Sequence, residues 1–466
     1  MVFSSLTFLY FFLPLNLLLY YISGNLLYRN ILLTLFSFVF YAWGEPFWIL
    51  LLLFTAIFDY GNGIWIEKLK NRNNSKYIVL FSVIINLGLL IAFKYSGFLY
   101  DNISYFISLP FDRPENTLPI GISFYTFQTI SYVIDVHRGE VKAQRNPINF
   151  LLFVSLYHQL VAGPIVRYKT IATEIDGRSF SWSDFSNGIS RFSLGLFKKV
   201  IIANNAAIFV DRYLIDQLHI ITGQEAWFGI VMFSVQIYFD FSGYSDMAIG
   251  LGKMFGFHYD ENFKNPYAAN SITDFWRRWH ISLGSFFRDY VYIPLGGNRK
   301  NVYLNLIIVW GLTGFWHGAS WNYMLWGLYF CLLLIIEKIF LLKLYDRMPR
   351  LVRHFTTLVF IIWGWALFYF EDLNKLALFT SKLFYFSEPE SLTFHADLIQ
   401  NLFWFIIVLI MCIPWNEITF ISRKYDSIAQ KSVVVGFQIM IQLIVLIVCS
   451  SYLLGNSYNP FLYFRF

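Results

Sequence analysis

The sequence is poor in charge. Only 14% of its 466 residues are Asp, Glu, Lys or Arg, whereas 57% are hydrophobic and 21% are aromatic. A water-soluble chain carries far more charge and cannot cover so much apolar side chain. The composition therefore excludes an ordinary soluble protein and indicates that lipid is the main solvent. In lipid the backbone must satisfy its own hydrogen bonds, which leaves a helical bundle or a closed β-barrel.

Cysteine and the common catalytic motifs are also scarce. The three cysteines, Cys331, Cys412 and Cys449, lie singly in apolar stretches, which excludes a disulfide framework and a zinc knuckle. No Walker loop, dinucleotide fingerprint, HExxH or GxSxG motif occurs. We expect no metal, no bound cofactor and no nucleic-acid partner. The N-terminus lacks a positive region and a small-residue cleavage site, so we expect its apolar segment to remain as a first span.

The apolar runs are unbroken and about twenty residues long, whereas barrel strands alternate over about ten residues. The sequence therefore predicts an all-α, polytopic helical bundle that forms one domain, residues 1–466, without an internal repeat. About twelve segments are long enough to cross the bilayer. They are residues 5–22, 30–44, 47–66, 77–97, 119–135, 188–210, 226–251, 301–316, 319–338, 353–370, 398–414 and 433–454. The apolar segment 148–165 lies between basic stretches, and we expect it to be re-entrant or interfacial.

The basic residues predict the orientation. Lys and Arg gather in alternate connections such as 68–76 and 252–300, whereas 101–115 and 371–397 are mainly acidic. Basic connections face the cytoplasm. Twelve spans with both termini outside satisfy this pattern.

The longest cytoplasmic connection, 252–300, mixes aromatic and basic residues, which is typical of a membrane interface. We expect Ser271 or Thr273 to cap a helix that carries His280 beside an apolar face. That face would consist of Trp276, Trp279 and Leu283. The alternative is a surface helix whose arginines contact lipid headgroups.

His317 lies in a glycine-rich break within the segment GLTGFWHGASWNYMLWG, residues 311–327. An ionisable residue at membrane depth is costly and marks a candidate functional site. A neutral imidazole among small and aromatic residues is suited to act as a general base. The alternative is a structural histidine that bonds to a backbone carbonyl.

The segment 236–250 contains polar residues four apart in the sequence, which therefore share a helix face. The pairs are Gln236 with Asp240 and Ser242 with Asp246. Two carboxylates in one span predict either an ion pathway or a structural network, and we favour the network. Gln128 and Asp135 are interpreted as packing or network residues.

Five segments together resemble the membrane-bound O-acyltransferase family. They are PIGISFYTFQTISYVIDVHRGE, QLVAGPIVRY, QIYFDFSGYSDMAIGLGKMFGF, NFKNPYAANSITDFWRRWHISLGSFFRDYVYIPLGGNRK and GLTGFWHGASWNYMLWG. The resemblance extends over a family core at residues 119–330. Within the family it is most similar to the branch of alginate O-acetylase and peptidoglycan O-acetyltransferase membrane subunits, and PLGGNRK favours that branch.

The resemblance implies acyl transfer across a bacterial cytoplasmic membrane. A cytoplasmic donor, acetyl-CoA, would enter a central tunnel, and the two family histidines match His317 and His280 as catalytic residues. The tail 461–466, FLYFRF, is similar to an aromatic C-terminal motif whose tyrosine, here Tyr463, would carry the acetyl group. A periplasmic partner protein would then transfer the group to a glycan: alginate, peptidoglycan or a related polymer.

Other interpretations remain open. The chain is also compatible with a secondary transporter or exporter of envelope glycan, or with a non-catalytic scaffold of an acetylation complex. An aromatic tail can simply sit in the membrane interface. The group that stabilises the oxyanion is undecided among Asn322, Trp316 and the backbone amides of the glycine-rich break.

Overall fold

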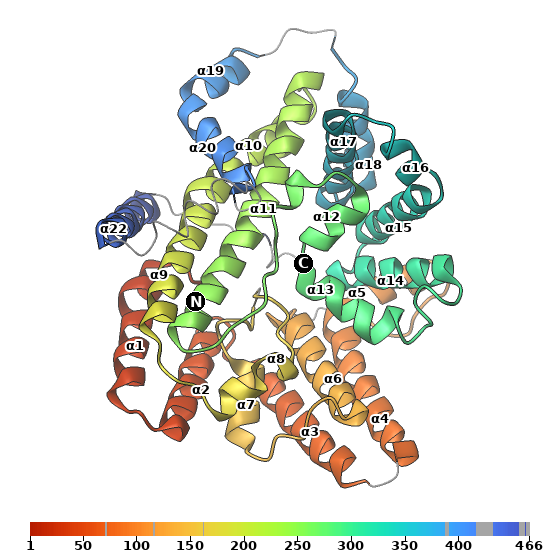
Figure 1. The fold of residues 1–466 in the computed structure, drawn as a ribbon. Helices are drawn as coiled ribbons and strands as arrows, with labels where there is room; N and C mark the ends of the chain where they lie inside the picture. The colour runs from red at the N-terminus through yellow and green to blue at the C-terminus, as the bar shows by residue number, and fades with distance from the viewer. Residues whose placement is uncertain are drawn as a thin grey trace. The chain divides into compact units, whose positions relative to one another are not determined.

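The computed structural model describes residues 1–69, 72–114, 117–161, 163–386, 391–415, 432–455 and 462. Every regular element in these ranges is helical, which confirms the all-α fold class (Figure 1). The chain divides into two compact units, Met1–Phe192 with Tyr244–Asp260, and Ser193–Gly243 with Glu261–Phe466. The prediction of one domain for residues 1–466 stays a prediction.

The first unit contains these helices and one-turn π-helical segments: η1 (Phe8–Phe12), α1 (Leu13–Ile22), α2 (Leu26–Ala42), α3 (Ile49–Lys68), α4 (Arg72–Leu90), η2 (Ile91–Tyr95), α5 (Ser96–Ser104), α6 (Ile122–Arg138), α7 (Pro147–Ser155) and α8 (Tyr168–Asp176). It also contains most of α9 (Trp182–Phe197) and the end of α11 (Gly223–Met254).

The second unit contains the remainder of α9 and α11 and these elements: η3 (Lys198–Ala203), α10 (Asn204–Val210), η4 (Asp211–Asp216), η5 (Pro266–Ala268), α12 (Ile272–Arg278), α13 (Ile281–Phe287), η6 (Arg288–Tyr292), α14 (Val302–His317), α15 (Trp321–Ile336), η7 (Glu337–Leu341), α16 (Leu342–Tyr345), α17 (Arg350–Tyr369), α18 (Leu373–Lys382), α19 (Leu392–Gln400), α20 (Leu402–Cys412) and α22 (Ser432–Gly455). Its three cysteines are free, as predicted.

Six described helical stretches are long and apolar enough to cross a membrane. They are Ile49–Lys68, Asn74–Ser104, Trp182–Asp216, Trp321–Tyr345, Arg350–Tyr369 and Gly436–Gly455. A helix pair bent by 63°, Leu392–Gln400 with Leu402–Cys412, raises the number to seven, and three shorter apolar helices are Phe8–Ile22, Leu26–Ala42 and Val302–His317. Each overlaps a predicted apolar window, and several extend beyond it. The chain is a multi-pass membrane protein, while the twelve spans and the outside termini stay predictions.

In the first unit, α3, α4 and α6 pack side by side (Figure 1). Buried Asp59 of α3 accepts hydrogen bonds from Ser82 Oγ at 2.6 Å and Asn86 Nδ2 at 2.8 Å. Gln128 and Asp135 of α6 are buried in this unit, as packing residues would be. The buried carboxylate of Asp59 thus finds its partners on α4, as an apolar solvent requires.

The carboxylates of α11 are ion-paired. Asp246 lies 2.7 Å from Arg191 in the first unit, and Asp240 lies 2.6 Å from Lys199 in the second. Both carboxylates are buried. This pairing is what a structural network requires, and it occupies the charges that an ion pathway would use.

The segment 148–165 is mostly not helical. Helix α7 has nine residues and ends at Ser155, and the described chain after it, as far as Arg167, has no regular structure. Nine residues rise only about 14 Å, which is too short to cross a bilayer.

The prediction of one amphipathic helix through Trp276, Trp279 and Leu283 is wrong. Ser271 caps α12 as expected, because its side chain accepts from Asp274 N–H. The helix nevertheless ends at Arg278, and α13 starts after His280, whose φ is +44°. The break is stabilised by the segment 262–264 of the same chain: Lys264 N–H donates to Arg278 O, and Ile281 N–H donates to Asn262 O. These tertiary hydrogen bonds replace those of a continuous helix.

Helices α14 and α15 approach each other closely through two glycines. A Cβ atom on Gly314 would lie 2.4 Å from Tyr323 O, and one on Gly327 would lie 2.5 Å from Trp310 O. Contacts this short are sterically forbidden, so the spacing of the two helices depends on hydrogen at both positions. The contact places His317, at the end of α14, against α15.

We predict that Gly314→Ala destabilises the protein by about 1–3 kcal/mol, because the methyl group overpacks the α14–α15 contact. Gly311→Ala is the matched control on the same helix, since nothing lies within 4 Å of its Cβ position. The unfolding temperature in detergent measures both. Equal unfolding temperatures for the two variants would contradict the close contact.

Candidate functional site

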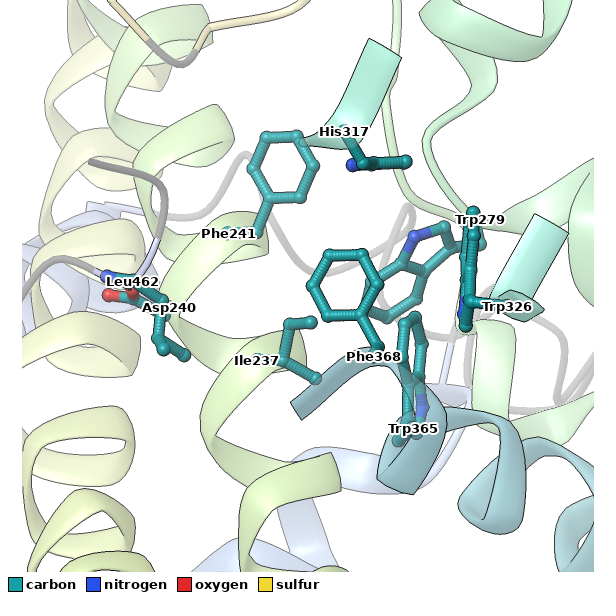
Figure 2. A pocket seen from close by; sticks show the side chains of 9 residues that line it. All are labelled: Ile237, Asp240, Phe241, Trp279, His317, Trp326, Trp365, Phe368 and Leu462. Carbon is teal, nitrogen blue, oxygen red and sulfur yellow. Dashed lines mark hydrogen bonds between the residues drawn. The ribbon is translucent and has the colours of Figure 1, made fainter. Parts of the chain in front are cut away.

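His317 lines a small cavity in the second unit, which we call the His317 cavity (Figure 2). Its volume is about 20 Å³, enough for roughly one water molecule. Its walls consist of Ile237, Asp240, Phe241, Trp279, His317, Trp326, Trp365, Phe368 and Leu462. Figure 2 shows Asp240 and Leu462 together at one side and the three tryptophans at the other. The cavity is therefore apolar except for His317, Asp240 and the indole nitrogens.

Three aromatic rings enclose the imidazole of His317. The rings of Trp326 and Phe368 meet it nearly edge-on, with centroids 4.9 Å and 5.2 Å away, and Trp316 lies at 5.0 Å. The side chain is only 7% exposed. Such surroundings exclude bulk water and fix the orientation of the imidazole, which are the conditions that a general base needs.

His280 occupies the break between α12 and α13, outside the membrane-spanning helices, and its side chain is buried. Its Nδ1 lies 3.1 Å from Asn262 Oδ1. The same oxygen accepts from Ser282 N–H, a group that can only donate, so Oδ1 is an acceptor and His280 Nδ1 is the donor. Burial lowers the pKa of His280 to about 3, so the ring is neutral at physiological pH.

His280 lines a second and larger cavity of about 480 Å³, the His280 cavity. Trp276, Trp279, Trp310 and leucines form its apolar part, whereas Arg277, Arg288 and Lys338 contribute positive charge. Arg288 pairs with Asp289 at 2.7 Å. Lys338 was not predicted as a site residue, because no sequence pattern shows that η7, which directly follows α15, lies beside α12 and η6.

A third cavity of about 360 Å³, the Glu371 cavity, is lined by polar and aromatic side chains. They include His219, Tyr323, Tyr369, Glu371, Asp372 and Lys375. Tyr323 Oη lies 3.4 Å from Glu371 Oε1. Glu371, Asp372 and Lys375 belong to the connection 371–397, which the charge distribution predicts to be outside, whereas Tyr323 and Tyr369 lie in predicted spans.

The three cavities follow one another through shared walls. Trp279 lines both the His280 and the His317 cavities, and Leu462 lines both the His317 and the Glu371 cavities. The two histidines thus belong to neighbouring cavities, with Trp316 between their rings at 6.0 Å from His280 and 5.0 Å from His317. An apolar chamber with one histidine lies between two larger cavities.

The other predicted site residues are placed as follows. Asn322 donates to the backbone oxygens of Leu367 and Phe368, so it holds the end of α17. Tyr463 lies outside the described residues. Leu462 was not predicted as a site residue; its backbone N–H donates to Asp240 Oδ2 at 2.8 Å. The only sequence signal for it was its place in the tail motif.

A multi-pass membrane fold with a histidine in a small apolar cavity between two larger cavities fits an integral-membrane transfer enzyme. Residues 140–376, which include both histidines, match the model of MBOAT, the membrane-bound O-acyltransferase family, over half of the chain. The chain belongs to this family and is an acyltransferase.

Three relatives illustrate its neighbourhood within the family. The chain is 42% identical over 396 residues to a Pseudomonas putida protein described as a probable alginate O-acetylase, AlgI, covering 83% of this chain and 81% of that protein. It is 34% identical over 412 residues to the peptidoglycan O-acetyltransferase of Helicobacter pylori, covering 80% and 78%. It is 28% identical over 249 residues to the teichoic acid D-alanyltransferase of Bacillus subtilis, covering 50% and 62%. The first two support the predicted branch.

We predict that His280→Asn retains most of the acyl-transfer activity, whereas His280→Ala loses about tenfold or more. Asn tolerates a positive φ and its amide can donate to Asn262, and Ala does neither. Because the low pKa keeps His280 neutral, the pH profile of kcat/KM from pH 5.5 to 9 should have the same shape in the Asn variant and the wild type. If the pH profile of the Asn variant lacked one limb of the wild-type profile, a purely positioning role for His280 would be contradicted.

Proposed function

We propose that this chain is an O-acetyltransferase of a bacterial cytoplasmic membrane. It takes acetyl groups from acetyl-CoA on the cytoplasmic side and passes them outward for O-acetylation of an extracytoplasmic polysaccharide. The observation that carries the proposal is the row of three cavities with His317 in the middle one. The names of the relatives, an alginate O-acetylase and a peptidoglycan O-acetyltransferase, support acetyl as the group and a glycan as the acceptor.

The His280 cavity suits the donor. Acetyl-CoA has anionic phosphates at one end and a thioester at the other. Arg277, Arg288 and Lys338 offer the positive charge that phosphates require, and the apolar remainder suits the pantetheine arm. Arg277 and Arg288 belong to the connection 252–300, which the positive-inside rule predicts to be cytoplasmic, whereas Lys338 is the last residue of the predicted span 319–338. The thioester would then point toward Trp279 and the His317 cavity.

His317 acts as the general base in this proposal. It accepts the proton of the Tyr463 hydroxyl, whose oxygen attacks the acetyl carbonyl carbon. The C–S bond breaks, CoA leaves as the thiol with the proton from His317, and Tyr463 holds the acetyl group as an ester. A dry chamber favours this route, because water would otherwise hydrolyse the thioester or the ester.

The second half of the reaction takes place at the Glu371 cavity. A hydroxyl of an extracytoplasmic partner protein attacks the Tyr463 ester, and Tyr463 recovers its proton. The partner then acetylates the glycan. The cavity is large enough for an extended side chain, and Glu371, Asp372 and Lys375 in its wall belong to a connection predicted to be outside.

A transporter or exporter of glycan has no specific support in the described residues, because Asp240 and Asp246 are each ion-paired in the protein interior. The scaffold interpretation makes the opposite prediction for His317, since a scaffold would work without that imidazole.

We predict that His317→Ala lowers polysaccharide O-acetylation by at least about a hundredfold, because a general base contributes that much. The measurement is the O-acetyl content of the envelope polymer, with membrane insertion confirmed by blotting. His395→Ala, at an exposed position on α19, is the control and should keep wild-type activity. Normal acetylation in the His317 variant would favour the scaffold.

We predict that Tyr463→Phe abolishes transfer to the acceptor, because the change removes only the hydroxyl that carries the acetyl group. Incubation of purified wild-type protein with radiolabelled acetyl-CoA should label the chain at Tyr463, and the Phe variant should stay unlabelled. Tyr385→Phe serves as the control. Full acetylation by the Tyr463 variant would rule out the ester intermediate.

A further inference from the structure

The backbone of Leu462 is attached to a buried carboxylate. Its N–H donates to Asp240 Oδ2 at 2.8 Å, and Leu462 is 6% exposed. A hydrogen bond to a carboxylate is stronger than one between neutral groups. The contact uses the main chain, so any residue except proline can make it at position 462.

Lys199 fixes the orientation of that carboxylate. Its Nζ lies 2.6 Å from Asp240 Oδ1, and the two side chains are only 2% and 3% exposed. One oxygen of Asp240 therefore faces the lysine while the other faces Leu462. A buried ion pair of this kind is costly to desolvate and adds little stability compared with apolar residues of the same volume, so its retention needs another reason.

Leu462 stands where two cavities meet. Its side chain lines the His317 cavity, which also contains Asp240, and the Glu371 cavity (Figure 2). An acceptor that enters the Glu371 cavity therefore meets Leu462 before it meets His317.

We propose that the Lys199–Asp240 pair docks Leu462 of the tail, and that the docked Leu462 closes the His317 cavity toward the Glu371 cavity. Asp240 is thus a positioning residue that acts through the backbone of Leu462. The inference deepens the proposed function and rests on it: release of Leu462 from Asp240 opens the chamber to the acceptor. The closure itself does not depend on Tyr463 being the acyl carrier.

The experiment measures access to the His317 cavity. Ile237→Cys places a thiol in its wall, and Cys412 and Cys449 are replaced by serine. Native Cys331, 2% exposed, remains as an internal control for unfolding. Purified protein in detergent is treated with a small methanethiosulfonate reagent, and modification at each cysteine is followed by mass spectrometry.

Leu462→Pro and Leu462→Met form the matched pair. Proline removes the N–H donor, whereas methionine keeps the donor and the side-chain volume. We expect the thiol introduced at position 237 to react at least tenfold faster in the Pro variant than in the parent, and the Met variant to match the parent. We expect Cys331 to stay unlabelled in both variants, which would show that the helical bundle is intact. Equal rates in all three proteins, or fast labelling in the parent, would overturn the proposal.

A second pair tests the ion pair itself. Lys199→Met with Asp240→Asn removes both charges but keeps an oxygen that accepts from Leu462, whereas Lys199→Met with Asp240→Leu removes the acceptor as well. We expect the thiol introduced at position 237 to react fast in the double variant with Asp240→Leu and slowly in the double variant with Asp240→Asn. If Cys331 also labels in the Leu version, that variant is unfolded and the proline–methionine pair decides.

Acetylation assays separate this inference from the proposed function. If Asp240 positions Leu462 as proposed, Lys199→Met with Asp240→Leu lowers kcat at least tenfold. KM for acetyl-CoA stays unchanged, because neither substitution lies in the His280 cavity, which is the proposed donor site. If Tyr463→Phe is inactive but Leu462→Pro leaves labelling unchanged, the proposed function stands and tail docking is overturned. If the thiol labelling follows the prediction while Tyr463→Phe stays active, the docking of Leu462 is supported and the ester intermediate is ruled out.

Discussion

A chain dissolved in lipid must satisfy its buried polar groups from within, and the described structure depends on this constraint. Arg191 pairs with Asp246 in one unit, and Lys199 pairs with Asp240 in the other. Asn262 supplies one oxygen to both His280 and Ser282. These partners come from distant parts of the sequence, so each pairing also fixes how helices and loops lie within a unit. Polar residues here are structural unless a cavity gives them a second role.

The same constraint separates the two histidines. At His280 the helix is interrupted, and the exposed backbone is satisfied by residues 262–264, so the ring belongs to a rigid hydrogen-bonded break. At His317 the interruption lies at a close glycine contact between α14 and α15, and aromatic rings surround the imidazole. One histidine is thus fixed by hydrogen bonds in a break of the chain, and the other faces an apolar chamber walled by aromatic rings.

In a membrane acyltransferase, narrow partitions are as important as cavities. A continuous open channel would let water into the apolar chamber and would leak ions. Trp279 and Leu462 each form a wall between two cavities. Trp279 belongs to an aromatic cluster with Phe275 and Trp365, whereas the backbone of Leu462 donates a hydrogen bond to Asp240. The two partitions are therefore built differently, one from packed rings and the other around a buried carboxylate.

The sequence by itself determined the all-α membrane fold, the approximate positions of the apolar helices and the family, and it limited the N-cap of α12 to Ser271 or Thr273, because these follow from composition, local periodicity and contiguous motifs. It also singled out His317. Tertiary structure alone decided the break at Trp279 and His280, because distant Asn262 and Lys264 supply the hydrogen bonds that replace the helix. It likewise decided that Asp240 binds Lys199 and Leu462. Asp240 and Leu462 are 222 positions apart, and no local sequence pattern encodes a contact over that separation.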